Sequence, residues 1–170
     1  MSGDKNRITA GLVQAIQYEF DGHHFYLMAA RATEDEQGRR VFEQLAEEEL
    51  AHLRFLHLQK LSFERIGQAD TSVELGQPAE FSEENAIFSP LVRERIKEAH
   101  FEMSALSIGL QLEYNSEKFY REQANEAEDP TVKAFFNTLA EWEGGHYRAL
   151  SEQLEELKDQ FWSSNEFAPW

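Results

Sequence analysis

The segments Glu49–His52 (Glu-Leu-Ala-His) and Glu143–His146 (Glu-Gly-Gly-His) each place a carboxylate and an imidazole three residues apart. On an α-helix this spacing puts both side chains on one face. A carboxylate oxygen and a neutral imidazole nitrogen on one face can bind the same transition-metal ion. A single pair of this kind is common on the solvated helices of Glu-rich chains, so the second copy is what makes the pattern informative.

Both segments belong to an internal repeat with an offset of 94 residues. Glu19 and Glu113 are related by this offset, and each precedes the Glu of its segment by 30 residues. Two antiparallel helices with ligands at one level would turn halfway, near residues 34 and 128, where Glu-Asp occurs in both copies. The offset also relates, without a gap, Phe25 to Phe119, Tyr26 to Tyr120, Ala30 to Ala124, Phe42 to Phe136, Leu45–Glu47 to Leu139–Glu141, Arg54 to Arg148 and Leu56 to Leu150. The chain is therefore predicted to contain two copies of one helical hairpin.

The composition restricts the classes of function. The length of 170 residues predicts a single domain, residues 1–170, with a substantial core. The net charge of −16 argues against a nucleic-acid partner, because phosphate would be repelled. The absence of Cys excludes disulfides, zinc–thiolate sites and iron–sulfur clusters. No apolar run approaches the ~18 residues of a membrane span and residues 1–7 have no signal-peptide core, so we expect a cytoplasmic protein.

Apolar periodicity predicts four long helices. They are expected over residues 9–32, 35–66, 91–127 and 130–162, with Thr9 as the first N-cap and a break in the third helix near Glu98–Phe101. The first two helices would form hairpin one, residues 9–66, and the last two hairpin two, residues 91–162. Short turns inside each hairpin make each pair of helices antiparallel.

Two segments fall outside this pattern. Residues 67–90 are interrupted by Gly and Pro, and are predicted to form a long crossover between parallel helices. Phe81, Ile87 and Phe88 would fasten the crossover to the bundle. The aromatic tail, residues 163–170, would cover an edge of the bundle or contact a second subunit, and the sequence leaves both interpretations open.

Glu19 falls within the apolar stripe of the first helix, whereas Glu47 and Glu48 fall off the stripe of the second and are predicted to be solvated. A buried carboxylate is costly unless it is paired or bound to a metal. The predicted ligand set is Glu19, Glu49, His52, Glu113, Glu143 and His146. Four carboxylates neutralise two divalent cations, and each ion receives one imidazole. An all-α four-helix bundle with Glu on two helices and Glu-x-x-His on the other two matches the di-iron or di-manganese carboxylate pattern.

The wider pattern resembles a known family. In each copy a Glu lies seven residues before a Tyr, an acidic turn follows, and Leu-Ala-x-x-Glu-x-x-His comes next. Over residues 9–160 this arrangement resembles rubrerythrin-like proteins of the ferritin-like superfamily. The resemblance implies that the six residues above bind two iron ions, and that the protein reduces hydrogen peroxide or oxygen. It also implies that Tyr26 and Tyr120 donate hydrogen bonds to ligating carboxylates, for which ordinary core packing is the alternative.

Two departures from the family pattern bear on activity. Rubrerythrins carry a further Glu three residues after the third-helix ligand, where this chain has Ser116, with Gly22 at the equivalent place in the first copy. Glu117 and His23 lie one residue further on; they are predicted to be solvated, and partial substitution for the missing Glu is the alternative. Rubrerythrins proper also end in a Cys-rich rubredoxin-like domain that delivers electrons, so this chain, which has no Cys, is expected to need an external electron-donor protein.

Several alternatives stay open at the level of sequence. Beside the peroxide- or oxygen-reducing enzyme, the chain fits a ferroxidase that takes Fe(II) for storage or delivery, or a non-catalytic metal-binding module. Oxygen and nitrogen ligands suit manganese as well as iron. We expect a homo-oligomer, a dimer. The Gly144–Gly145 pair would open space for substrate or permit close packing with a neighbouring helix or subunit.

Overall fold

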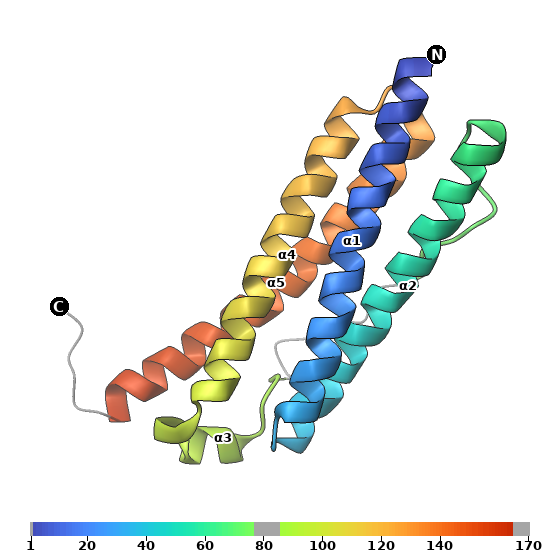
Figure 1. The fold of residues 1–170 in the computed structure, drawn as a ribbon. Helices are drawn as coiled ribbons and strands as arrows, with labels where there is room; N and C mark the ends of the chain where they lie inside the picture. Colours follow the sequence, from blue (N-terminus) through green and yellow to red (C-terminus); the bar gives the residue numbers. More distant parts are fainter. Residues whose placement is uncertain (1, 77–85, 165–170) are drawn as a thin grey trace.

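The computed structural model describes residues 2–76 and 86–164, and these ranges contain helices but no strand. In chain order the elements are α1 (Ser2–Ala32), α2 (Glu36–Ile66), α3 (Pro90–Glu94), the 3-10 turn η1 (Ile96–Glu98), α4 (His100–Glu126) and α5 (Pro130–Ser164). α1 packs along α2, α4 packs along α5, and α1 also contacts α4. In Figure 1 the turns of the two hairpins lie at opposite ends of the bundle, and α2 runs parallel to α4. The prediction of an all-α bundle of two helical hairpins is confirmed.

The helices differ from their predicted ranges mainly at the ends. α1 begins at Ser2, so the prediction of an N-cap at Thr9 is wrong. No Pro interrupts residues 2–8, and Ile8 is buried against the bundle, so the helix continues through this segment. The predicted break in the third helix is present, because α3 and η1 end before α4 begins at His100. Among the described residues, every helix is too short or too polar to span a bilayer.

The buried apolar side chains form two clusters. In each of the four long helices, the predicted ligands fall between residues of one cluster and residues of the other. Each cluster contains a tyrosine stacked on a phenylalanine. Tyr26 stacks on Phe42 with ring centroids 6.2 Å apart, and Tyr120 stacks on Phe136 at 6.0 Å. The polar layer is therefore enclosed along the bundle axis by apolar packing on both sides.

The described part of the crossover is tied to the bundle. Ile87 and Phe88 are buried, as predicted, and Phe88 contacts Phe42 edge-on with ring centroids 5.8 Å apart. The Phe88 N–H donates to Gln153 Oε1 at 3.3 Å. Phe81 and residues 165–170 of the predicted tail lie outside the described residues. The contacts of Ile87 and Phe88 bring the chain back to the bundle just before α3 begins.

Asp35 joins the first hairpin turn to the crossover. Its Oδ2 accepts hydrogen bonds from the Gly38 N–H at 2.8 Å and the Ser89 N–H at 3.1 Å, and its Oδ1 accepts from the Ser89 hydroxyl. The equivalent residue of the second hairpin, Asp129, accepts from the Thr131 N–H at 2.8 Å and caps α5. Asp35 thus combines the N-cap of α2 with an anchor for a segment distant in the sequence.

We expect Asp35→Ala to lower the free energy of unfolding by about 2–3 kcal/mol, and Asp129→Ala by about 1 kcal/mol. Loss of a cap costs about 1 kcal/mol, and the larger effect at position 35 arises because part-buried donors of the crossover also lose their acceptor. Urea unfolding of both variants, with the wild-type chain as reference, measures the difference. Equal losses at the two positions would contradict the anchoring role of Asp35.

Candidate metal centre

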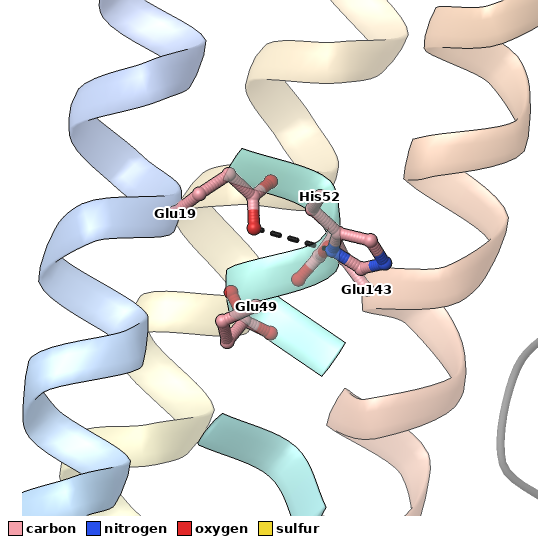
Figure 2. Close-up of side chains that lie close together, drawn as sticks. All are labelled: Glu19, Glu49, His52 and Glu143. Atoms are coloured by element: carbon pink, nitrogen blue, oxygen red, sulfur yellow. Dashed lines mark hydrogen bonds and ion pairs between the residues drawn. The ribbon is translucent and has the colours of Figure 1, made fainter. Parts of the chain in front are cut away.

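The six predicted ligands meet at one level of the bundle. Glu19 comes from α1, Glu113 from α4, and the two Glu-x-x-His pairs from α2 and α5. All six residues are buried, none more than 3% exposed. Figure 2 shows four of them, with the carboxylate of Glu19 directed at the ring of His52. The spacing that places Glu and His on one face of each motif helix also directs both residues of that helix inward.

The six residues form two overlapping groups. One group contains Glu19, Glu49, His52 and Glu143, and the other contains Glu49, Glu113, Glu143 and His146. Within each group, one ligand atom per residue lies within 4.8 Å of the others. Glu49 and Glu143 belong to both groups. Two carboxylates shared between two sets of donors is the arrangement expected for a pair of ions bridged by carboxylates.

Both histidines present Nδ1 to the carboxylates. His52 Nδ1 lies 3.2 Å from Glu19 Oε2 and 3.2 Å from Glu143 Oε1. His146 Nδ1 lies 3.5 Å from Glu49 Oε1 and 3.5 Å from Glu113 Oε2. The ring centroids of the two histidines are 6.3 Å apart. The two imidazoles thus approach the same carboxylate layer with the same nitrogen.

The two buried tyrosines cross between the hairpins. Tyr26 of α1 donates its hydroxyl hydrogen to Glu113 Oε1 on α4, and Tyr120 of α4 donates to Glu19 Oε1 on α1. Burial, together with the nearby carboxylates, raises the pKa of both phenols well above its usual range. Each hydroxyl therefore stays a hydrogen-bond donor and restrains the carboxylate oxygen that it contacts.

The buried charges oppose one another in the protein alone. Burial raises the pKa of Glu49 and of Glu143 well above the usual range, and the neighbouring carboxylates raise both further. Burial alone would lower the pKa of His146, but the Glu113 carboxylate outweighs it and the pKa is raised well above its usual value. Burial alone would likewise lower the pKa of His52, but the Glu19 carboxylate outweighs burial and the pKa of His52 is raised. Burial alone would raise the pKa of Glu113, yet His146 holds it below its usual value.

The donor atoms fit bound cations. Glu49 Oε1 and both carboxylate oxygens of Glu143 are buried without a well-aligned hydrogen bond to any described residue. Unsatisfied polar atoms of this kind are rare in folded proteins and call for a ligand or ordered water. Oxygen and imidazole donors in two overlapping groups suit divalent first-row metals. The residues present therefore fit a dinuclear metal centre.

Two residues beside the centre escaped the sequence prediction. The prediction that Glu48 is solvated is wrong, because its Oε2 lies 2.9 Å from His146 Nε2 and its side chain is only 12% exposed. Trp142 packs against His52 with ring centroids 4.8 Å apart. Helical periodicity predicted only the residues of the central stripe to be buried. Glu48 lies at the edge of α2, where its side chain reaches His146 on α5. The available signal was the offset of 94 residues, which relates Glu48 to Trp142.

The structure also shows the surroundings of Gly22 and Ser116, the two positions that depart from the rubrerythrin pattern. A Cβ atom at Gly22 would lie 2.8 Å from Glu49 Oε2, so this position leaves room for the ligand carboxylate. Ser116 is buried, and Glu117 is bound by Arg121 at 2.7 Å instead of joining either ligand group. A Cβ atom at Gly144 would lie 3.3 Å from the Glu117 carboxyl carbon. Gly144 therefore faces the end of the Glu117 side chain of α4, whereas a Cβ atom at Gly145 would meet only Arg148 of its own helix, at 4.0 Å.

We expect Gly22→Ala to weaken metal binding about tenfold without destabilising the metal-free bundle. The added methyl must displace the Glu49 carboxylate, while alanine favours a helix interior by about 1 kcal/mol. Gly11→Ala on the same helix is the matched control, because its methyl would meet only the flexible Gln123 side chain. Co(II) titration and thermal unfolding of both variants provide the readouts. Identical metal affinities in the two variants would show that Gly22 does not serve the centre.

The other histidines stay outside the centre. His23 Nδ1 lies 2.7 Å from the Ala46 carbonyl oxygen, and His24 Nδ1 lies 2.9 Å from that of Phe20. His57 and His100 are exposed. Within residues 2–76 and 86–164, neither ligand group includes any of the four. His23 is half-buried and not fully solvated as predicted, but it contacts backbone and no ligand.

Comparison with known proteins agrees with this geometry. The family model described as Rubrerythrin matches residues 11–154, which include α2 and α4, most of α1 and α5, and all six clustered side chains. The chain therefore belongs to the rubrerythrin family. No curated protein and no solved structure matches it.

Proposed function

We propose that this rubrerythrin-family chain binds two iron ions in the buried cluster and uses them to reduce hydrogen peroxide or oxygen with electrons from an external donor. The observation that carries the proposal is the convergence of four buried carboxylates and two imidazoles in two overlapping groups. Two divalent ions would neutralise these carboxylates, which otherwise repel one another in a medium of low dielectric. Membership of the family supports iron and oxygen or peroxide chemistry.

The proposed ligands are Glu19, Glu49, His52, Glu113, Glu143 and His146. Glu49 and Glu143 would be available to both ions, because they belong to both groups. Tyr26 and Tyr120 fix the orientation of the two carboxylates that belong to one group each. The apolar clusters on either side exclude bulk water, which strengthens the attraction between carboxylate and cation.

When bound, two Fe(II) ions would supply the two electrons, one each, that together with two protons reduce one hydrogen peroxide to two water molecules, and the external donor would restore those electrons. The protein's part is to hold six donors in place during this cycle, which the two tyrosine hydroxyls and the apolar clusters favour.

The test begins with elemental analysis of protein purified without added metal, which also distinguishes iron from manganese. Stopped-flow absorbance after mixing Fe(II)-loaded protein with hydrogen peroxide, and separately with oxygen, then measures oxidation. We expect about two irons per chain and a rapid absorbance change that an added reductant reverses. Failure to bind any metal after reconstitution would overturn the proposal.

Two other functions give different results in the same experiments. A ferroxidase that stores or delivers iron would react faster with oxygen than with peroxide, accumulate more than two irons per chain, and form a large assembly by light scattering. A non-catalytic metal-binding module would hold two ions that stay silent toward both oxidants. Reversible turnover with peroxide by a small assembly separates the proposed enzyme from both.

A further inference from the structure

Glu48 fixes the orientation of one imidazole. An ionised carboxylate only accepts hydrogen bonds, so the 2.9 Å contact requires His146 to donate from Nε2 to Glu48 Oε2. When the ring is neutral, as it must be to bind a metal, its lone pair then lies on Nδ1, the nitrogen that faces Glu49 and Glu113. A carboxylate behind a metal-binding histidine holds the ring in place and makes it a stronger donor.

The other imidazole has a different neighbour. His52 Nε2 is buried without a hydrogen-bond partner among the described residues. The Trp142 ring lies against His52 at an angle of 69° between the ring planes, and an indole nitrogen donates hydrogen bonds but does not accept them. Trp142 therefore confines the His52 ring by packing and cannot orient it as Glu48 orients His146.

Glu48 and Trp142 occupy the same place in the two halves of the repeat, 94 residues apart. We propose that this substitution makes the two metal positions unequal. The position formed by Glu49, Glu113, Glu143 and His146 takes up a divalent cation first and holds it more tightly. The position formed by Glu19, Glu49, His52 and Glu143 fills second and exchanges its ion more readily. The inference rests on the proposed metal centre, and it assigns Glu48 and Trp142 as positioning residues.

Charge and orientation act in the same direction. Glu48 adds a fourth carboxylate to the three of the His146 position, and in an interior of low dielectric this extra charge attracts a cation strongly. The hydrogen bond from Nε2 also removes rotational freedom of the ring before the ion arrives. The His52 position has neither contribution, although the distances from Nδ1 to its carboxylates are as short.

The experiment is a titration of the metal-free chain with Co(II). Calorimetry and the ligand-field absorption of the bound ion monitor the binding. We expect two steps whose dissociation constants differ about tenfold or more, the range over which such outer partners act. Glu113→Gln, which alters only the His146 position, should remove the tight step. Glu19→Gln, which alters only the His52 position, should remove the weak step.

Substitution of Glu48 provides the decisive comparison. Glu48→Gln should weaken the tight step by about 10- to 100-fold and leave the weak step unchanged. Glu47→Gln is the matched control, because it removes the same charge from an exposed neighbour on α2. Trp142→Glu should tighten the weak step. If that variant does not fold, the comparison of Glu48→Gln with Glu47→Gln tests the inference without it. A general structural role for Glu48 would weaken both steps together.

The outcomes separate this inference from the proposed function. Two Co(II) ions bound with equal affinity would overturn the inference and leave the metal centre intact. A Glu48→Gln titration identical to that of Glu47→Gln would also overturn it, as would loss of the tight step in Glu19→Gln. Absence of Co(II) binding in every form of the chain would remove the metal centre and the inference together.

Discussion

Replacing Glu143 by Gln is expected to weaken metal binding at both positions by at least about 100-fold, while making the metal-free bundle more stable. Glu143 belongs to both groups of donors, so one substitution removes an oxygen ligand from each. Loss of an outer partner costs about 10- to 100-fold in affinity, and loss of a direct ligand costs more. Glu19→Gln or Glu113→Gln should instead spare one position.

The gain in stability follows from the environment of the side chain. Glu143 is fully buried among three other carboxylates, and both burial and these neighbours raise its pKa well above the usual range. In the metal-free chain at pH 7 it is either ionised against like charges or protonated. Protonation of a carboxyl costs about 1.4 kcal/mol for each pH unit above its ordinary pKa. Gln avoids both states, so the free energy of unfolding should rise by up to about 3 kcal/mol.

Metal titration and urea unfolding of the same preparation measure both effects. Glu141→Gln is the matched control, because Glu141 is exposed on the same helix and its loss changes the net charge equally. The control should leave metal affinity unchanged and alter stability by less than about 0.5 kcal/mol. A Glu143→Gln variant that still binds two ions tightly would show that the ligand assignment is wrong.

Much of the fold could be predicted from the sequence, because the repeat and the apolar stripes specify local and long-range structure together. Glu and Asp near residues 34 and 128 marked both hairpin turns, and Asp35 and Asp129 do cap the helices that follow. The start of α1 could not be predicted, because Ser2 to Ile8 have no strong signal of their own. Ile8 extends the helix through packing against residues distant in the sequence, which a local pattern does not reveal.

The candidate centre was predictable where its residues face the bundle axis. Glu19 and Glu113 stood out because a carboxylate inside an apolar stripe needs a partner. Glu48 did not stand out, because the periodicity of α2 does not indicate which residue of α5 lies beside the edge of α2. Its contact with His146 depends on how closely the two hairpins pack. Contacts between edges of helices are set by the whole bundle, and a single helix pattern cannot supply them.

The second prediction with a large effect concerns pH. The metal-free chain should lose stability as pH rises from about 5 to 8, and the metal-loaded chain should gain stability relative to it. Burial and neighbouring carboxylates raise the pKa of Glu49 and Glu143 in the folded chain. A group with a raised folded pKa contributes stability below its unfolded pKa, and this stability is lost as pH rises through the folded value.

The histidines act in the same direction. Burial alone would lower the pKa of His146 and of His52, but Glu113 and Glu19 respectively outweigh it and raise both values. Their contribution is present below about pH 6.5 and is lost as pH rises through the folded values. Glu113 has the opposite sign, because His146 overcomes the effect of burial and lowers its pKa. Its contribution is present above about pH 4.3 and is lost only as pH falls through the folded value, outside the window considered.

Thermal unfolding of the chain in chelator, at steps between pH 5 and 8, tests this prediction against the same series with Co(II). Each pKa unit of separation between the folded and unfolded states is worth about 1.4 kcal/mol, and 1 kcal/mol moves the Tm of a chain of this size by about 2–4 °C. Bound metal should reverse the trend, because its ligands must lose their protons. Glu143→Gln should flatten the metal-free series, whereas Glu141→Gln should retain the wild-type slope. A metal-free Tm that rises over this window would mean that the buried carboxylates do not oppose one another, and the physical reason for expecting cations at the centre would be lost.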